Sequence, residues 1–158
     1  MESPAAEAYR SVSFWHESVP GALTPRPALD GDIDVDVAIV GAGFTGLWTA
    51  YYLKTLKPDL EIAILEKEIA GFGASGRNGG WCGALIAASW GRLARESSRE
   101  GAIATQQALF DTVDEVGRVA AAEGIDCHFH KGGTITLARS EAQLIRAREW
   151  EAECREWG

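Results

Sequence analysis

The sequence lacks the features of several binding and membrane classes. Its 15 Lys and Arg residues are outnumbered by 23 Asp and Glu residues, for a formal net charge of −8. This balance provides no basic surface for nucleic acid or for anionic lipid headgroups. No apolar run is long enough to cross a bilayer, and the start of the chain lacks the basic and apolar segments of a secretory signal. We therefore expect no nucleic-acid partner and no membrane partner.

Cysteine is also scarce. Cys82, Cys127 and Cys154 are widely spaced, and no C-x-x-C pattern is present. This spacing indicates neither a disulfide framework nor a zinc site. His128 and His130 have no third ligand at metal-binding spacing. We predict no metal site, and reduced thiols in a cytoplasmic protein.

The chain begins with an arm and continues with alternating strand and helix patterns. Residues 1–33 are expected to form an irregular N-terminal arm, because the prolines between positions 20 and 27 exclude a long helix. Trp15 is expected to pack this arm onto the rest of the chain. Residues 34–158 are expected to form one α/β portion, with strands over 35–40 and 60–66 around an apolar helix over 47–57.

Further helices are predicted beyond this unit. One covers 85–98 with an interruption near Gly91, and a clearer one covers 100–123 and ends at Gly124. A strand, a bend and a second strand are expected over 126–138, followed by a last helix that Ser140 caps. The predicted fold class is α/β: a Rossmann-like βαβ unit with following helices and a short β element, as an incomplete domain.

A glycine motif joins the first strand to the first helix of this unit. Residues 41–46, GAGFTG, match G-x-G-x-x-G in the strand–helix context that makes the pattern specific. Gly41 allows a tight turn, Gly43 lets the backbone approach a pyrophosphate, and Gly46 lets the helix lie close to the strand. The free N–H groups of the first helical turn then face the phosphates.

An acidic residue ends the second strand. Glu66 is placed to accept hydrogen bonds from ribose hydroxyls, and its charge disfavours a ligand with a 2′-phosphate. The βαβ unit alone leaves NAD and FAD open as ligands.

A glycine-rich loop, residues 71–81 (GFGASGRNGGW), follows this acid. Its glycines permit close backbone approach to a long ligand, and Ser75, Arg77 and Asn78 supply hydrogen-bond donors. A simple NAD-binding unit needs no such second loop, so the loop favours FAD.

Together, GAGFTG, AILEKE and GFGASGRNGGW resemble the N-terminal part of the D-amino-acid-oxidase-like family of FAD-dependent oxidoreductases, a likeness that extends from about Ser13 to the end of the chain. The resemblance assigns the pyrophosphate to Gly41, Gly43, Phe44, Thr45 and Gly46. It assigns the adenosine to Glu66 and Lys67. It places the ribityl chain and flavin beside Gly73, Ala74, Ser75, Arg77, Asn78, Gly79, Gly80 and Trp81.

The resemblance also implies a reaction, the oxidation of a C–N bond in a small amine or amino acid, with hydride passing to the flavin, an imine product and oxygen as acceptor. Some relatives attach FAD covalently to a loop His, but no His lies between Lys67 and Cys127, so we expect non-covalent FAD. No catalytic residue is identified.

Family members are much longer than this chain. We therefore expect either a fragment of a longer protein or a truncated natural product, inactive by itself in both cases, with uncovered apolar surface through which copies can self-associate. The alternative is a non-catalytic dinucleotide-binding module or a partner subunit.

Overall fold

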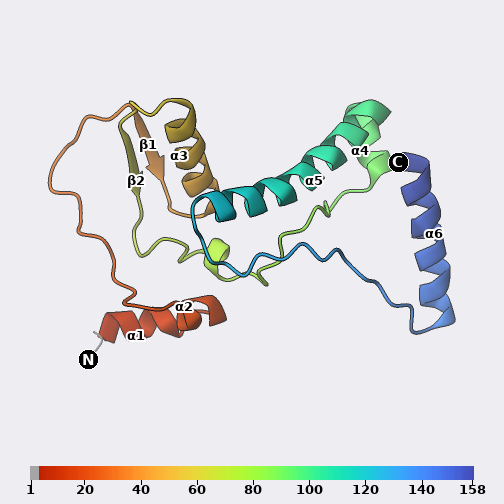
Figure 1. Ribbon diagram of the computed structural model, residues 1–158, viewed down its shortest axis with the longest axis horizontal. Helices are drawn as coiled ribbons and strands as arrows, with labels where there is room; N and C mark the ends of the chain where they lie inside the picture. Colours follow the sequence, from red (N-terminus) through yellow and green to blue (C-terminus); the bar gives the residue numbers. More distant parts are fainter. Residues whose placement is uncertain (1–3) are drawn as a thin grey trace. The chain divides into compact units, whose positions relative to one another are not determined.

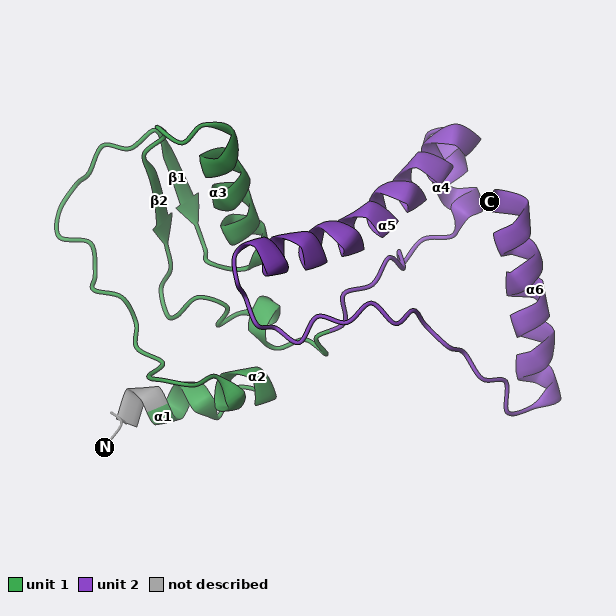
Figure 2. Cartoon of the chain, in the orientation of Figure 1, with its two compact units in different colours: residues 1–80 green, residues 81–158 purple. Residues whose placement is uncertain are grey.

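The computed structural model describes residues 4–158, so the first three residues of the predicted arm lie outside the described residues. The chain forms two compact units, Met1–Gly80 and Trp81–Gly158, which Figure 2 shows in different colours. The first unit contains α1 (Pro4–Arg10), α2 (Phe14–Ser18), β1 (Val37–Val40), α3 (Phe44–Leu56), β2 (Ile62–Leu65) and the 3-10 turn η1 (Ala74–Gly76). The second contains α4 (Trp90–Glu96), α5 (Arg99–Ala122) and α6 (Glu141–Trp157).

The first unit is organised around the predicted βαβ unit. β1 and β2 are parallel, with Val37 opposite Ile62 and Val40 opposite Leu65. α3 connects them and lies alongside the two-stranded sheet (Figure 1). The apolar runs form strands as expected, although each strand is shorter than the run that predicts it. The parallel pairing brings the carboxyl ends of both strands to one edge, where ligands bind in folds of this kind.

The arm is more regular than its sequence predicts. We expected residues 1–33 to be irregular, but α1 and α2 occupy positions 4–18, and only the proline-containing segment after them is irregular. Ser13 begins α2 by accepting a hydrogen bond from the His16 N–H. The Arg10 guanidinium donates to the carbonyls of Glu17 and Val19 at 3.2 and 3.0 Å, which fixes the end of α2. Short helices are formed here because the prolines lie after them.

The helices of the second unit follow the sequence pattern to different extents. α5 matches its predicted range within one residue at each end, and Gly124 follows it at a φ of +64°. The N–H groups of Gly124 and Ile125 donate to the carbonyls of Ala121 and Ala120, which is the Schellman arrangement. The helix predicted over 85–98 is confined to α4, and Gly91 lies inside it instead of interrupting it. The side chain of Ser89 caps this shorter helix.

The predicted β element over 126–138 is not formed in the described part of the chain. This segment follows α5, with Phe129 against Gly117 and Lys131 paired with Asp114. His128 has a φ of +52°, outside the strand region, so His128 and His130 do not share a strand face. A strand needs hydrogen bonds from a neighbouring strand, and the described residues provide none here. α6 begins as predicted, with the Ser140 hydroxyl accepting the Gln143 N–H.

Buried positions in the described residues are occupied mainly by small side chains. They are His16, Ala42, Gly46, Ile69, Ala102, Val119 and Ala120. Within the same residues, no helix has the length and apolar character needed to cross a membrane.

Candidate dinucleotide site

The strand-to-helix turn has the geometry that its glycines predict. Gly41 has a φ of +98°, in the left-handed region, and its N–H donates to the Leu65 carbonyl at 2.8 Å. A Cβ on Gly46 would lie 2.1 Å from the Gly41 oxygen and 3.2 Å from Ile39 Cγ2. Only glycine therefore allows α3 to start this close to the strand.

The N-terminus of α3 faces the glycine-rich loop. Gly43 is the N-cap residue and has no side chain to cap the helix. The Ser75 hydroxyl of the loop takes this role and accepts the Phe44 N–H at 2.9 Å. A Cβ on Gly43 would lie 2.9 Å from the same hydroxyl oxygen. Glycine at position 43 thus leaves room for an oxygen ligand at the helix N-terminus, where anions are favoured.

The carboxylate of Glu66 joins the end of β2 to this turn. Its Oε2 accepts the Ala42 N–H at 2.8 Å, and its Oε1 accepts the Glu68 N–H at 3.1 Å. The first of these hydrogen bonds is the main cause that lowers the pKa of Glu66 from its ordinary value of 4.5, and the second adds to it. The side chain is solvent-exposed. An ionised carboxylate has about four lone-pair sites, so acceptor sites remain for ribose hydroxyls.

The glycine-rich loop uses its polar side chains to hold its own shape. The Arg77 Nε donates to the Phe72 carbonyl at 2.7 Å, and the guanidinium lies 4.4 Å from the centre of the Phe72 ring. The Asn78 amide donates to the Ser75 carbonyl and accepts the Gly80 N–H, each at 2.7 Å. The Gly71 N–H donates to the Ala42 carbonyl at 2.9 Å, which ties the loop to the turn.

The structure brings together some of the residues that the sequence nominated, and leaves others apart. The turn residues 41–46, Glu66 and Ser75 converge at one edge of the sheet. Thr45 is exposed in the first turn of α3, and Gly73, Ala74 and Gly79 are exposed in the loop. The Lys67 side chain is 90% exposed and pairs with Glu68. Trp81 belongs to the second unit.

The arm contributes residues that the sequence argument did not place at the site. The Tyr9 hydroxyl donates to Glu68 Oε2 at 2.9 Å, and this hydrogen bond is the main cause that raises the pKa of Tyr9. The Ser13 hydroxyl lies 2.6 Å from the Gly76 carbonyl, and the Trp15 Nε1 lies 2.7 Å from the Asn78 carbonyl. Trp15 packs the arm onto the domain, as expected. The sequence offered one sign of the Ser13 contact: this serine precedes the aromatic pair at positions 14 and 15, where a helix-capping residue is expected.

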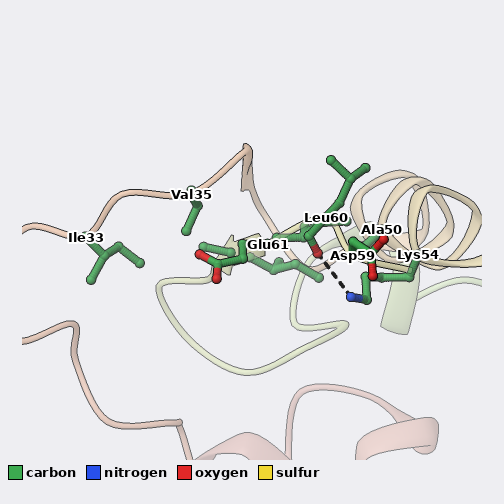
Figure 3. A pocket seen from close by; sticks show the side chains of 10 residues that line it. Ile33, Val35, Ala50, Lys54, Asp59, Leu60 and Glu61 are labelled. Atoms are coloured by element: carbon green, nitrogen blue, oxygen red, sulfur yellow. Dashed lines mark hydrogen bonds between the residues drawn. The ribbon is translucent and has the colours of Figure 1, made fainter. Parts of the chain in front are cut away.

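A separate open hollow of about 610 Å³ lies beside β2 (Figure 3). Its lining includes Ile33, Ala50, Leu60 and Ile62, and the Lys54 ammonium donates to the Leu60 carbonyl at 3.0 Å, drawn as a dashed line. None of the nominated nucleotide-binding residues lines it. We therefore assign no part of the dinucleotide site to this hollow.

The chain is similar to known proteins over most of its length. The family described as "FAD dependent oxidoreductase" (DAO) matches residues 36–158. Gamma-glutamylputrescine oxidoreductase of Escherichia coli is 27% identical over 158 aligned residues, covering 93% of this chain and 34% of that protein.

Matches to thiamine thiazole synthases cover about half of the chain. The protein of Schizosaccharomyces pombe is 39% identical over 82 residues, and that of Emericella nidulans is 47% identical over 80 residues. These matches cover 51% and 49% of this chain, and 24% and 23% of those proteins. The chain thus spans from about a quarter to about a third of the length of these relatives. No solved structure matches significantly.

Proposed function

This chain belongs to the DAO family of FAD-dependent oxidoreductases, and we propose that its first unit binds the adenosine and pyrophosphate part of FAD without a covalent bond. Within this proposal, the backbone of residues 43–45 binds the pyrophosphate and Glu66 binds the ribose. The glycine-rich loop lies beside the ribityl chain and the flavin. The whole protein is a cytoplasmic oxidoreductase that acts on a C–N bond.

One observation carries the proposal: the α3 N-terminus, the Ser75 hydroxyl and the Glu66 carboxylate converge at the same edge of the sheet. Ser75 Oγ accepts the Phe44 N–H at 2.9 Å, so an oxygen already occupies a position that a phosphate oxygen can take. Glu66 is held beside this position through the Ala42 N–H. The residues therefore fit an anionic pyrophosphate next to a ribose diol.

The proposed substrate is a small amine or amino acid. Support comes from the relative whose name specifies gamma-glutamylputrescine, a derivative of an amine. When bound, FAD supplies the acceptor for a hydride from the carbon next to nitrogen. The residues of this chain bind and orient the cofactor: Glu66 holds the ribose, the α3 N-terminus neutralises phosphate charge, and the loop glycines allow close backbone approach. The imine product hydrolyses in water, and oxygen is the proposed final acceptor.

The non-covalent linkage is tested by denaturing the purified full-length protein and separating small molecules from the polypeptide. We expect the yellow flavin in the soluble fraction, because no His is present between Lys67 and Cys127. Flavin that stays with the precipitated polypeptide would contradict the non-covalent linkage. Protein that contains no flavin and binds none on addition would contradict the whole proposal.

A second candidate function is a dinucleotide-binding module without catalysis of its own. It is favoured by the geometry of the edge, because the groups that converge there are suited to bind a pyrophosphate and a ribose. An anaerobic titration of the flavin-loaded full-length protein with putrescine derivatives, sarcosine and glycine separates the two candidates. Bleaching of the flavin by an amine supports the oxidoreductase. Bound flavin that no amine bleaches supports the module.

A further inference from the structure

The N-terminal helices contact the glycine-rich loop at three positions. α1 and α2 belong to the same unit as the loop up to Gly80. The Tyr9 ring packs edge-to-face on Phe72, with 5.9 Å between ring centres. The Ser13 hydroxyl contacts the Gly76 carbonyl, and the Trp15 indole contacts the Asn78 carbonyl. These contacts reach the beginning, the middle and the end of the loop.

The middle contact, between Ser13 and Gly76, belongs to a network in which the Ser13 hydroxyl uses its one hydrogen and both of its acceptor sites. Ser13 Oγ lies 2.6 Å from the Gly76 carbonyl and 2.6 Å from His16 Nδ1, and it accepts the His16 N–H at 3.3 Å. A hydroxyl has one hydrogen, and a carbonyl only accepts. Ser13 therefore donates to Gly76, and His16 Nδ1 must carry a proton and donate to Ser13. His16 is 5% exposed, so its imidazole is shielded from water, whereas Ser13 and Gly76 are half-buried.

The loop glycines fit closely against these arm residues. A Cβ on Gly76 would lie 2.8 Å from His16 Cε1 and 2.1 Å from the Gly71 oxygen. A Cβ on Gly80 would lie 2.4 Å from the Trp15 ring. Gly80 also has a φ of +74°, in the region that glycine prefers. The backbone of the loop thus follows a path that the arm side chains define.

We propose that the N-terminal helices position the glycine-rich loop for FAD, with Ser13, Trp15 and His16 as the positioning residues. This inference rests on the proposed function, because it assigns the loop to the cofactor. None of the three side chains is assigned a contact with FAD. They act through the carbonyls of Gly76 and Asn78, and so fix which loop N–H groups remain free for the ligand. The segment from 72 to 80 has few other fixed points beyond its internal hydrogen bonds and the Ser75 contact.

The test measures FAD affinity, flavin absorbance and amide hydrogen exchange in the full-length protein. Ser13→Ala removes the Gly76 contact, and Trp15→Phe removes the Asn78 contact while keeping an aromatic ring. We expect each to weaken FAD binding by about two- to tenfold, the range of one net hydrogen bond. Each is also expected to change the visible absorbance of the bound flavin and to speed exchange in the loop. Ser18→Ala and Trp150→Phe are matched controls, because the Ser18 hydroxyl donates within α2, to the Trp15 carbonyl, and Trp150 lies in α6.

His16 provides a rescue experiment. His16→Ala removes the donor to Ser13, whereas His16→Asn keeps an N–H donor near the Nδ1 position. We expect the Asn variant to recover affinity, absorbance and exchange toward wild type. Equal losses in both variants would contradict a positioning role through Ser13. Fast amide hydrogen exchange in β1 and β2 identifies any variant that has lost the fold. If the His16 variants do so, the Trp15→Phe variant provides the test.

The outcomes separate this inference from the proposed function. Wild-type protein without flavin overturns the proposed function, and the positioning role with it. Wild-type protein with flavin, together with arm variants that match it in affinity, absorbance and loop exchange, overturns only the inference. Losses confined to the arm variants, with both controls unchanged, support it.

Discussion

The two units differ in what their longest contacts join. In the first unit, the hydrogen bonds of Ser13 with Gly76 and of Trp15 with Asn78 each span 63 positions and join the arm to the glycine-rich loop. In the second, the ion pair between Arg99 and Glu156 and the ring contact between Trp90 and Trp157 are similarly distant in sequence, but they join one helix to another. The candidate site lies in the unit whose distant contacts end on a loop. The path of that loop therefore depends on the fold, whereas the helices of the second unit also have contacts within one turn, such as the ion pair of Arg155 with Glu151.

The two units also differ in what becomes of an apolar segment. β2 pairs with β1 in a parallel register, and three of its four residues are half-buried. The segment over 126–138 has a similar apolar pattern but no paired strand among the described residues, and Ile135 and Leu137 are 85% and 77% exposed. A strand is a property of two segments rather than one. The same kind of apolar pattern therefore forms a strand in the first unit and an unpaired segment in the second.

The largest expected effect comes from glycine substitutions in the two units. Gly46→Ala places a Cβ 2.1 Å from the Gly41 oxygen. We expect a loss of about 1–3 kcal/mol in the free energy of unfolding and loss of FAD binding. The matched change in the second unit is Gly91→Ala, in α4, where the nearest atom is 3.8 Å away. It should stabilise the protein by up to about 1 kcal/mol, since alanine is the better helix former.

Denaturant unfolding and FAD titration of both variants measure this contrast. Similar changes in the free energy of unfolding of Gly46→Ala and Gly91→Ala would contradict the proposed difference between the two units. Normal FAD binding by Gly46→Ala would mean that the turn is not the binding site.

The second prediction concerns Glu66. Glu66→Gln keeps the size of the side chain but turns one acceptor into a donor. We expect FAD affinity to fall about 10- to 100-fold, because hydrogen bonds to a charged group contribute about 1.5–3 kcal/mol. The control is Glu149→Gln on α6, which should not change FAD affinity. Equal affinity of wild type and Glu66→Gln in equilibrium titration would mean that Glu66 does not face the ribose.

The third prediction compares two serine caps. Ser75 accepts the first N–H of α3 from a distant loop, and Ser140 caps α6 from the adjacent position. Ser140→Ala should cost about 1 kcal/mol of stability and leave FAD binding intact. Ser75→Ala should cost a similar or smaller amount and also weaken FAD binding. Thermal unfolding with and without FAD measures both effects, and an unchanged FAD affinity in Ser75→Ala would remove this serine from the site.

The smallest expected effect is a pKa difference between two carboxylates. The pKa of Glu66 is lowered mainly by the Ala42 N–H, whereas that of Glu100 is lowered by its own backbone N–H and by Ser98 at the start of α5. In each case the stability that the ionised form contributes is present above the ordinary value of 4.5 and is lost as the pH falls through the lowered value.

Carbon-13 NMR titration of two peptides tests the origin of these shifts. A peptide over 60–70 should lose most of the lowering at Glu66, because Ala42, the main donor, is absent from it. A peptide over 98–122 should keep part of the lowering at Glu100, to the extent that its helix forms. A pKa for Glu66 as low in the short peptide as in the whole protein would show that its environment is local.

The sequence by itself determined the features that depend on near neighbours. The apolar runs and the glycine spacing predict the β1–α3–β2 order, because strand, turn and helix preferences act over a few residues. α5 and its end at Gly124 follow from a 3.6-residue period and from a glycine at positive φ. Ser140 begins α6 because its hydroxyl reaches an N–H three residues away. These features, together with the family resemblance, were sufficient to nominate Glu66 and the glycine-rich loop.

Only the tertiary structure decided the features that need a partner distant in the chain. The apolar segment over 126–138 stays unpaired because no second strand lies beside it in the described part of the chain. Arg77 and Asn78 were nominated as ligand donors, yet their side chains donate hydrogen bonds to carbonyls of the loop itself. Ser75 reaches the helix N-terminus, and Ser13 reaches Gly76, because folding closes separations of 31 and 63 positions. Local preference cannot encode such contacts, since their formation depends on how α3, β2 and the arm pack together.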